Sequence, residues 1–293
     1  MERRTFIRLM AIAAFFSPRM VRNLGAKELP LVGVATGTDY GKITRDAIAA
    51  VGGMKRFVKP GDVVVVKPNM GWDRTPEQAA NTNPQVVKAV IEEVLKAGAK
   101  KVKVFDRTCN DERRCYANSG IQAALKGLSN VEVHFIENER FKKVVLNGEA
   151  LKEWDLYGEV LSANVFINVP VAKHHKLTGL SLGLKNIMGV MGGDRGKLHK
   201  QIEPALADVN AVLKSHLTVI DATRILTDHG PQGGDLADVK IMNTVIASAD
   251  IVAADAYATT IFGKKPTDIG VTVAAAKRGI GEIDLKKVRV VKV

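Results

Sequence analysis

Apolar and polar residues between positions 63 and 105 alternate in blocks that predict a strand, a helix and a second strand. Four consecutive valines at residues 63–66 are typical of a strand that is buried on both faces. Asn83 and Pro84 then open a segment whose apolar residues recur at helical spacing until Gly98, a residue type common at helix ends. Residues 102–105 begin the next apolar run. Together these segments predict one βαβ unit, in which a crossover helix joins two parallel strands.

The same alternation continues through the rest of the chain. Further strands are expected at residues 131–136, 165–169, 217–220 and 245–247. Further helices are expected near residues 42–54, 178–191, 203–215, 250–262 and 267–278. This order predicts an α/β fold with a mainly parallel sheet and helices on both faces. Residues 28–293 are expected to form a single domain, and a division into two lobes near residue 150 is left open.

Polar side chains follow four of the predicted strands at the point where each strand ends. Ligands of open α/β sheets bind outside the carboxyl ends of the strands, so we expect these side chains to surround one cleft. The alternative is that individual Asp and Asn residues only stabilise turns or helix ends. The residues are Lys67 and Asn69 after the first strand, Asp106 and Arg107 after the second, Asn168, His174 and His175 after the third, and Asp221 after the fourth.

The segment from residue 173 to residue 200 is the densest in chemically active side chains. A helix with Thr178 as its N-cap would bury an apolar stripe and place Ser181, Lys185 and Met188 on the adjacent face. A lysine beside a buried stripe loses part of its hydration, which lowers its pKa. Lys185 is therefore expected to act as a reactive amine or as a fixed cation for an anionic ligand.

Three histidines flank the glycine-rich part of this segment. His174 and His175 are consecutive, so in an extended chain they point to opposite sides, and we assign His175 to the cleft. His199 follows the glycine-rich part. Imidazole binds nickel, zinc, copper or iron and serves in acid–base catalysis near neutral pH. A hydrogen-bonded structural role is the alternative for each of these histidines.

Composition argues against several classes of protein. The net charge is +12, but five of these charges fall in residues 1–27, and only 5% of the residues are aromatic, so a nucleic-acid-binding surface is not expected. Two cysteines are too few for a four-iron cluster. Cys109 and Cys115 either pair or remain as one buried and one exposed thiol.

The N-terminus resembles a twin-arginine export signal. Arg3 and Arg4 are followed by Phe6 and Arg8, and then by an apolar run over residues 9–16. This run is too short to cross a bilayer as a helix, which needs about 20 residues. Residues 1–27 are therefore expected to direct export to the periplasm or another extracytoplasmic space. A basic terminus of a cytoplasmic protein is the alternative.

Several short motifs carry a resemblance over most of residues 30–290. They are Lys67-Pro68-Asn69, residues 81–84, Gly98-Ala99, Asp106, residues 170–186, His199 and Gly230-Pro231. Together they resemble the domain of unknown function 362 family. Many members of that family carry ferredoxin-like motifs of four cysteines, which this chain lacks. The resemblance therefore implies no electron-transfer cluster of its own.

A second, local likeness concerns the chemistry of the same segment. His175, Gly179, Ser181, Gly183, Lys185, Gly189 and His199 are similar to the H-x-x-x-G-x-S-G-G-x-K pattern and the downstream histidine of nickel-dependent lactate racemase. This likeness implies that Lys185 bears a covalent nickel-pincer nucleotide, that His199 ligates nickel and that other histidines move protons. Residues 106–108 are loosely similar to the D-x-T-R-P segment of that enzyme. The chain departs from the pattern at Leu182, where a glycine is expected, and has no proline after Lys185.

From these features we expect an exported enzyme that acts on a small anionic metabolite by redox chemistry or by proton or hydride transfer. It would use nickel, zinc or iron, or a metal-bearing organic cofactor. The alternative is a non-catalytic protein that binds a cofactor or accompanies an iron–sulfur redox protein. The nominated residues are His175, Lys185 and Asp106 as catalytic groups, Lys67, Asn69, Arg107, Ser181, Lys185, Asn186 and Asp221 as cofactor-binding groups, and His175 and His199 as metal ligands.

Overall fold

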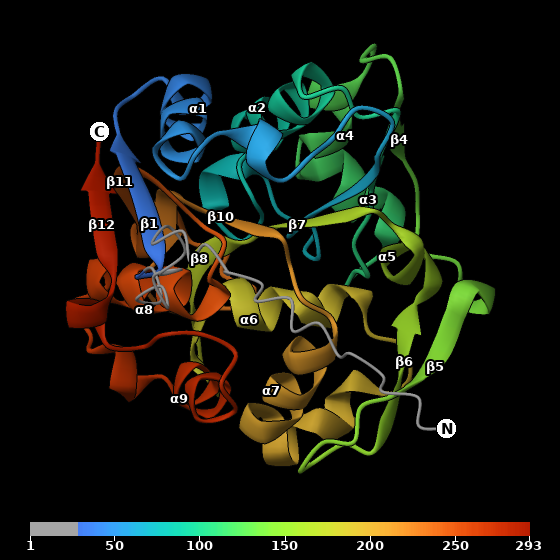
Figure 1. The fold of residues 1–293 in the computed structure, drawn as a ribbon, viewed down its shortest axis with the longest axis vertical. Helices are drawn as coiled ribbons and strands as arrows, with labels where there is room; N and C mark the ends of the chain where they lie inside the picture. Colours follow the sequence, from blue (N-terminus) through green and yellow to red (C-terminus); the bar gives the residue numbers. More distant parts are fainter. Residues whose placement is uncertain (1–28) are drawn as a thin grey trace, which may run out of the picture.

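The computed structural model describes residues 29–293 (Figure 1). The expected export signal at residues 1–27 lies outside the described residues. The described chain is built on a ten-stranded sheet with the main order β12-β1-β11-β10-β7-β2-β3-β4. These strands are β1 (Leu31–Thr36), β2 (Val63–Pro68), β3 (Lys101–Val104), β4 (Val131–Val133), β7 (Val165–Val169), β10 (Leu217–Leu226), β11 (Val239–Ser248) and β12 (Arg289–Lys292).

Two hairpins complete the strands of the described region. β8 (Val171–His175) continues from β7 after Pro170, pairs parallel with the far half of β10, and carries β9 (Gly179–Ser181) folded back against it. β5 (Phe141–Val145) and β6 (Glu153–Tyr157) form a separate antiparallel pair. Residue 150 lies between β5 and β6, and strands from both sides of it share the ten-stranded sheet.

Most neighbouring strands of the sheet run parallel, as predicted. β10, β7, β2, β3 and β4 are parallel to their neighbours in this order, whereas β11 is antiparallel to both β10 and β1. The chain builds outward from β2 to β4, and β7 then returns on the other side of β2. A reversal of this kind opens a crevice at the carboxyl ends of the two central strands, β2 and β7.

Helices cover both faces of the sheet (Figure 1). α1 and α2 pack on one face, and α6, α7, α8 and α9 pack on the other. The bounds are α1 (Tyr40–Ala50), α2 (Pro84–Lys96), α3 (Glu112–Asn118), α4 (Ile121–Leu125), α5 (Gly158–Ser162), α6 (Gly183–Asn186), α7 (Ile202–Val212), α8 (Ile251–Ile261) and α9 (Gly270–Lys277).

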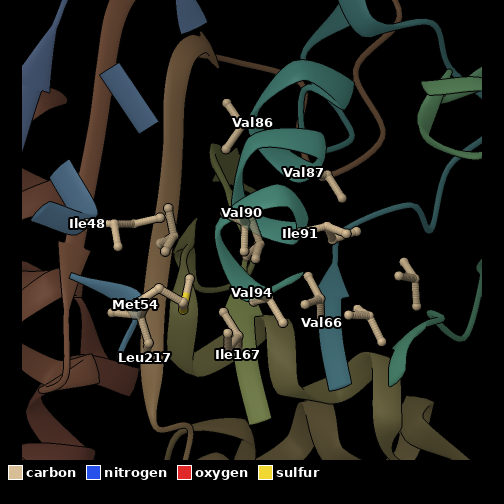
Figure 2. Packing of buried hydrophobic residues seen from close by; sticks show 14 of the residues in the cluster. Ile48, Met54, Val66, Val86, Val87, Val90, Ile91, Val94, Ile167 and Leu217 are labelled. Carbon is tan, nitrogen blue, oxygen red and sulfur yellow. The ribbon is translucent and has the colours of Figure 1, made fainter. Parts of the chain in front are cut away.

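Alternation along β2 fixes which of its side chains meet each layer of helices. Val64 and Val66 face α1 and α2, whereas Val65 belongs to the apolar cluster on the opposite face. Figure 2 shows Val90 and Val94 of α2 packed near Val66 of β2 and Ile167 of β7. Each fully buried side chain of this type contributes about 1.5–3 kcal/mol relative to an exposed one. The valine-rich strands therefore hold the carboxyl edge of the sheet in place from both sides.

Every strand predicted from apolar runs is present, but the helix expected near residues 178–191 is shorter than predicted, and its first residues form a strand instead. The hydroxyl of Thr178 donates to the carbonyl of Leu180 and does not cap a helix, and residues 179–181 pair as β9. The helix begins only at Gly183, where the distant Asp255 carboxylate accepts the backbone N–H groups of Gly183 and Leu184 at 2.7 and 2.9 Å. α6 then ends after four residues, and a 3₁₀ turn follows at Ile187–Val190.

Candidate functional site

A cavity of about 500 Å³ opens at the carboxyl ends of β2, β3 and β8. This size falls within the range of small-molecule sites. The cavity gathers side chains from segments far apart in the sequence, because their strands end at the same edge. The nominated residues that line it are Lys67, Asn69, Asp106, Arg107, His175, Ser181, Lys185, Asn186 and His199.

Asp221 is the nominated residue that does not line the cavity. β10 runs on to Leu226, so Asp221 lies within the strand and not at its end. Its carboxylate accepts the backbone N–H of Asn83 at 2.7 Å and the N–H and hydroxyl of Thr223 at 2.9 and 2.7 Å. Burial raises the pKa of this carboxyl group. Asp221 therefore orients the start of α2, and its expected place in the cleft is corrected.

Lys67 uses all its donors inside the protein. Its Nζ lies 2.8 Å from each of three oxygens, which belong to the Asp106 carboxylate, the Pro68 carbonyl and the Asn186 side chain. Burial lowers the pKa of Lys67, and the neighbouring Asp106 carboxylate opposes this effect. An ammonium group has three N–H donors, so Lys67 has none left for a ligand.

The partners of Lys67 are equally engaged. The second carboxylate oxygen of Asp106 accepts the backbone N–H of Met70 at 2.8 Å. The side-chain amide of Asn186 donates to Asn168 at 2.8 Å and accepts from Asn69 at 3.2 Å. We call Lys67, Asn69, Asp106 and Asn186 the closed wall of the cavity. Their hydrogen bonds hold the carboxyl ends of β2, β3 and β7 together.

Gly189 allows the segment after α6 to approach this wall. A Cβ atom at this position would overlap the Asp106 carboxylate and the end of the Lys67 side chain. The carbonyl of Gly189 also accepts the backbone N–H of Arg107 at 2.8 Å. Only a residue without a side chain can occupy this position while the ion pair stays in place.

Two arginines beside the cavity hold backbone segments. Arg107 donates to the carbonyls of Met191 and Gly193 at 3.0 and 2.9 Å. Arg195, which was not nominated from the sequence, donates to the carbonyls of Arg107, Met188 and Thr108 at 3.1–3.2 Å. Carbonyl groups are neutral, so both arginines still contribute positive charge to the cavity.

Two lysines form what we call the open wall, Lys173 and Lys185, and neither has a carboxylate partner within the described residues. The contact found for Lys185 Nζ is the Met188 sulfur at 3.4 Å. Burial lowers the pKa of Lys185 to about 8 and that of Lys173 to about 7. The sequence reasoning missed Lys173, although strand alternation could have found it. Residues i and i+2 share a face, so Lys173 belongs beside His175.

His175 lines the cavity, whereas His174 does not. The Nδ1 atom of His175 accepts the backbone N–H groups of Leu177 and Thr178, both at 3.2 Å. This arrangement requires the neutral tautomer with its proton on Nε2. Burial and the neighbouring lysines lower the pKa of His175 to about 3. His175 is therefore a hydrogen-bond donor at neutral pH.

His199 has the opposite tautomer. Its Nδ1 atom lies 3.0 Å from the carbonyl oxygen of Gly196, which can only accept a hydrogen bond, so Nδ1 carries the proton. The lone pair of Nε2 is then free to bind a metal ion. Within residues 29–293 no group of three or more His, Cys, Asp and Glu side chains is arranged to hold a metal ion.

The two cysteines are free thiols. Cys109 is exposed and lines the cavity, and Cys115 is buried with its sulfur 3.5 Å from the carbonyl of Gly71. Burial raises the pKa of Cys115 to about 11, so this thiol stays protonated at neutral pH. Of the two alternatives for this pair, the structure has one buried and one exposed thiol.

The family is decided by the match of residues 64–260 to the model of a domain of unknown function, DUF362. The chain belongs to the DUF362 family. This DUF362 protein is 28% identical over 244 residues to a thylakoid-associated protein of Synechocystis sp., covering 80% of this chain and 74% of the relative. In residues 29–293 no helix has the length and apolar character needed to cross a membrane.

A solved structure shares the fold of this DUF362 protein. It is the lactate racemase apoprotein from Thermoanaerobacterium thermosaccharolyticum, with a TM-score of 0.50 and 11% sequence identity. The match covers 80% of this chain but 57% of the racemase chain, so this protein spans little more than half of that structure. At this identity the likeness establishes a common α/β architecture.

Proposed function

We propose that this DUF362 protein is an enzyme that moves a proton or hydride on a small anionic metabolite, with a metal-bearing organic cofactor attached at Lys185. The observation that carries the proposal is the charge of the cavity. Lys67 and Asp106 neutralise each other, which leaves Lys185, Arg107, Arg195 and a partly protonated Lys173 against the exposed carboxylate of Asp194. An excess of cations in a cavity favours carboxylate and phosphate ligands.

The donor set fits a metal held by an organic group better than a bare metal ion. His199 offers a single free imidazole nitrogen, and the described residues supply no cluster of three ligands. The amine of Lys185 has free donors and a pKa near 8, so about a tenth of it is neutral at pH 7, far more than for an exposed lysine, and is available for a covalent bond. When bound, such a group would supply the metal and the acceptor for a hydride or an electron pair.

The sequence suggested His175 as a metal ligand, but in this proposal it is a hydrogen-bond donor to the ligand. Its Nδ1 accepts two backbone N–H groups and its Nε2 carries a proton, so neither nitrogen offers a lone pair to a metal. The Nε2–H group instead donates to an oxygen of the ligand. Asp106 is bound to Lys67 and Met70, and it acts by positioning the closed wall.

The decisive experiment is mass spectrometry of the intact protein purified from its native host, followed by peptide mapping. The expected result is an added mass located on Lys185 and absent from the Lys185→Arg variant. A Lys185 that is unmodified in protein from the native host would contradict the proposal.

Metal binding by the same native preparation tests His199. The His199→Ala variant should bind Ni²⁺ at least about tenfold more weakly, and binding by the parent protein should weaken in acid, where protons compete with the metal for imidazole nitrogens. His216→Ala is the control, because the His216 side chain accepts the backbone N–H of Phe166 and lies outside the cavity. Equal affinity for Ni²⁺ in the His199→Ala and His216→Ala variants would show that His199 is not a metal ligand.

We also propose that residues 1–27 direct twin-arginine export. The thylakoid association of the Synechocystis relative supports an extracytoplasmic location. Replacing Arg3 and Arg4 by Lys should abolish export of a folded reporter fused to residues 1–27. Export that is unchanged in the variant, or no export by the parent fusion, would contradict the proposal and favour the cytoplasmic alternative.

A further inference from the structure

Lys173 has an unusual setting for a lysine, because it is almost fully buried and no acid neutralises it. Its side chain is 1% exposed and still lines the cavity. Nζ donates to the carbonyl of Ala80 and to the side-chain oxygen of Asn69, the latter at 3.4 Å, and lies 5.7 Å from the centre of the Trp72 ring. None of these partners carries a full negative charge.

The charged groups around Lys173 come from β2, from the segment after β3 and from α6. Burial is the main cause of its pKa near 7, and the positive charges of Lys185 and Lys67 lower the pKa further, whereas Cys109 and Asp106 raise it. His175 also lies close by, but it is neutral near pH 7 because its pKa is about 3. About half of Lys173 is therefore an uncharged amine near pH 7.

The neighbouring lysines are suited to other tasks. Lys67 is held by three oxygens and has no free donor. Lys185 has a pKa of about 8, so near pH 7 it is mostly an ammonium group with donors available to an anion. The open wall thus places one neutral amine beside one cation. This combination is what a lysine needs to attack a carbonyl compound that is also negatively charged.

We propose that Lys173 captures a carbonyl group in this cavity and forms an imine with a small ligand that also bears a carboxylate or phosphate. The lone pair of Nζ attacks the carbonyl carbon, a C–N bond forms, and the amine gives up its two protons. The carbonyl oxygen takes both protons and leaves as water, so no oxidant or reductant is consumed. In protein that carries no group on Lys185, the ammonium group of Lys185 holds the negative group of the ligand.

This inference rests on the proposed function in one respect. Lys173 would act on the same anionic ligand that the proposed function places in this cavity. The two lysines remain separable by experiment. The proposed function is tested by the mass of native Lys185, whereas imine formation is tested on recombinant full-length protein with an added aldehyde.

The probe is glyoxylate, the smallest aldehyde that carries a carboxylate, in the presence of sodium cyanoborohydride. The hydride reduces an imine to a stable secondary amine, which peptide mapping locates as a carboxymethyl group. We expect Lys173 to be the first lysine labelled. At pH 6 its labelling should exceed that of Lys185 by about tenfold, because one unit of pKa changes the neutral fraction tenfold.

The rate of labelling against pH provides a readout that needs no variant. For Lys173 it should reach half its maximum near pH 7, whereas labelling of the free model compound Nα-acetyllysine, whose pKa is about 10.4, should still be rising at pH 9. Acetaldehyde, which is neutral, should label Lys173 at least about tenfold more slowly than glyoxylate. The variant Lys185→Met should remove this preference for the charged aldehyde.

Lys173→Arg keeps a positive charge but cannot form an imine, and it should lose the fast label while Lys176→Arg keeps it. Labelling of Lys185 or of surface lysines before Lys173, or a Lys173 rate that rises only above pH 9, would overturn the proposal. If native Lys185 carries an adduct and Lys173 fails these tests, only the imine is excluded. If Lys173 passes and native Lys185 is unmodified, the cofactor attachment fails instead.

Discussion

The two walls of the cavity contain the same residue type in opposite states. In the closed wall, Lys67 lies 2.8 Å from Asp106 and two further oxygens, and its hydrogen bonds are complete. In the open wall, Lys173 and Lys185 have no carboxylate partner among the described residues. A buried lysine thus maintains the structure when it has an acid partner and becomes available for chemistry when it has none. Variants of the two walls should accordingly separate stability from ligand binding.

The largest effect is expected for Asp106→Asn in the closed wall. The amide cannot neutralise Lys67, which is left as an uncompensated buried charge, and this typically costs about 3–5 kcal/mol. Urea unfolding monitored by circular dichroism measures the loss. Asp194→Asn is the control, since that side chain is 60% exposed and should change stability by less than about 1 kcal/mol. Similar losses for both variants would show that the closed wall does not depend on its ion pair.

A smaller loss is expected for Gly189→Ala. The added methyl group overlaps the Asp106 carboxylate and the Lys67 side chain, and both are buried and cannot move away. Overpacking of this kind costs about 1–3 kcal/mol. Gly196→Ala meets the exposed side chain of Asp194 and should be nearly neutral in the same unfolding experiment. A Gly189→Ala protein as stable as the parent would mean that the closed wall has room for a methyl group beside its ion pair.

The open wall should behave in the opposite way. Lys185→Met removes a desolvated cation that has no acid partner, so stability should stay within about 1 kcal/mol of the parent. In recombinant protein with an unmodified Lys185, affinity for inorganic phosphate, measured by titration calorimetry, should fall tenfold or more, which corresponds to about 1.4 kcal/mol. Lys176→Met, on the exposed part of the same segment, should leave affinity unchanged. Unfolding of Lys185→Met, with no effect on phosphate, would reverse the assignment of the walls.

The smallest effect concerns the pH dependence of stability at His175. The unfolded chain takes up a proton on this residue near pH 6.5, whereas the folded protein does so only near pH 3. Between these values the unfolded state binds more protons, so stability is complete above pH 6.5 and falls as pH falls. At pH 5.5 the expected loss is about 1.4 kcal/mol.

His175→Asn tests this, because its side-chain oxygen can replace Nδ1 as acceptor but does not titrate. We measure the free energy of unfolding in urea at several pH values. The variant should lack the fall in stability below pH 6.5 that His175 causes. His229 provides a control of opposite sign. A hydrogen bond to Asp238 raises the pKa of His229, so its contribution is present at low pH and is lost as pH rises. An acid dependence that survives in His175→Asn would assign the effect to another group.

The fold could be predicted to the extent that it depends on local apolar runs. The valines of β2 and the helical spacing in α2 are buried by any parallel sheet with helices on both faces, so their pattern is informative by itself. The helix predicted at residues 178–191 differs from the structure because its start depends on contacts with distant parts of the chain. Its first residues pair with β8, and the helix is capped by Asp255, which lies about 70 residues further along the chain.

The site followed the same division. The sequence by itself determined which residues end the parallel strands, and so brought Lys67, Asp106 and His175 to one edge. Only the tertiary structure decided what each of them does. A pKa, a tautomer or a free donor depends on neighbours within a few ångströms, and these neighbours come from distant segments. Lys67 and Lys173 are the same residue type in the sequence. Asp106 forms an ion pair with Lys67 but not with Lys173, and this difference in neighbours separates a structural lysine from an available one.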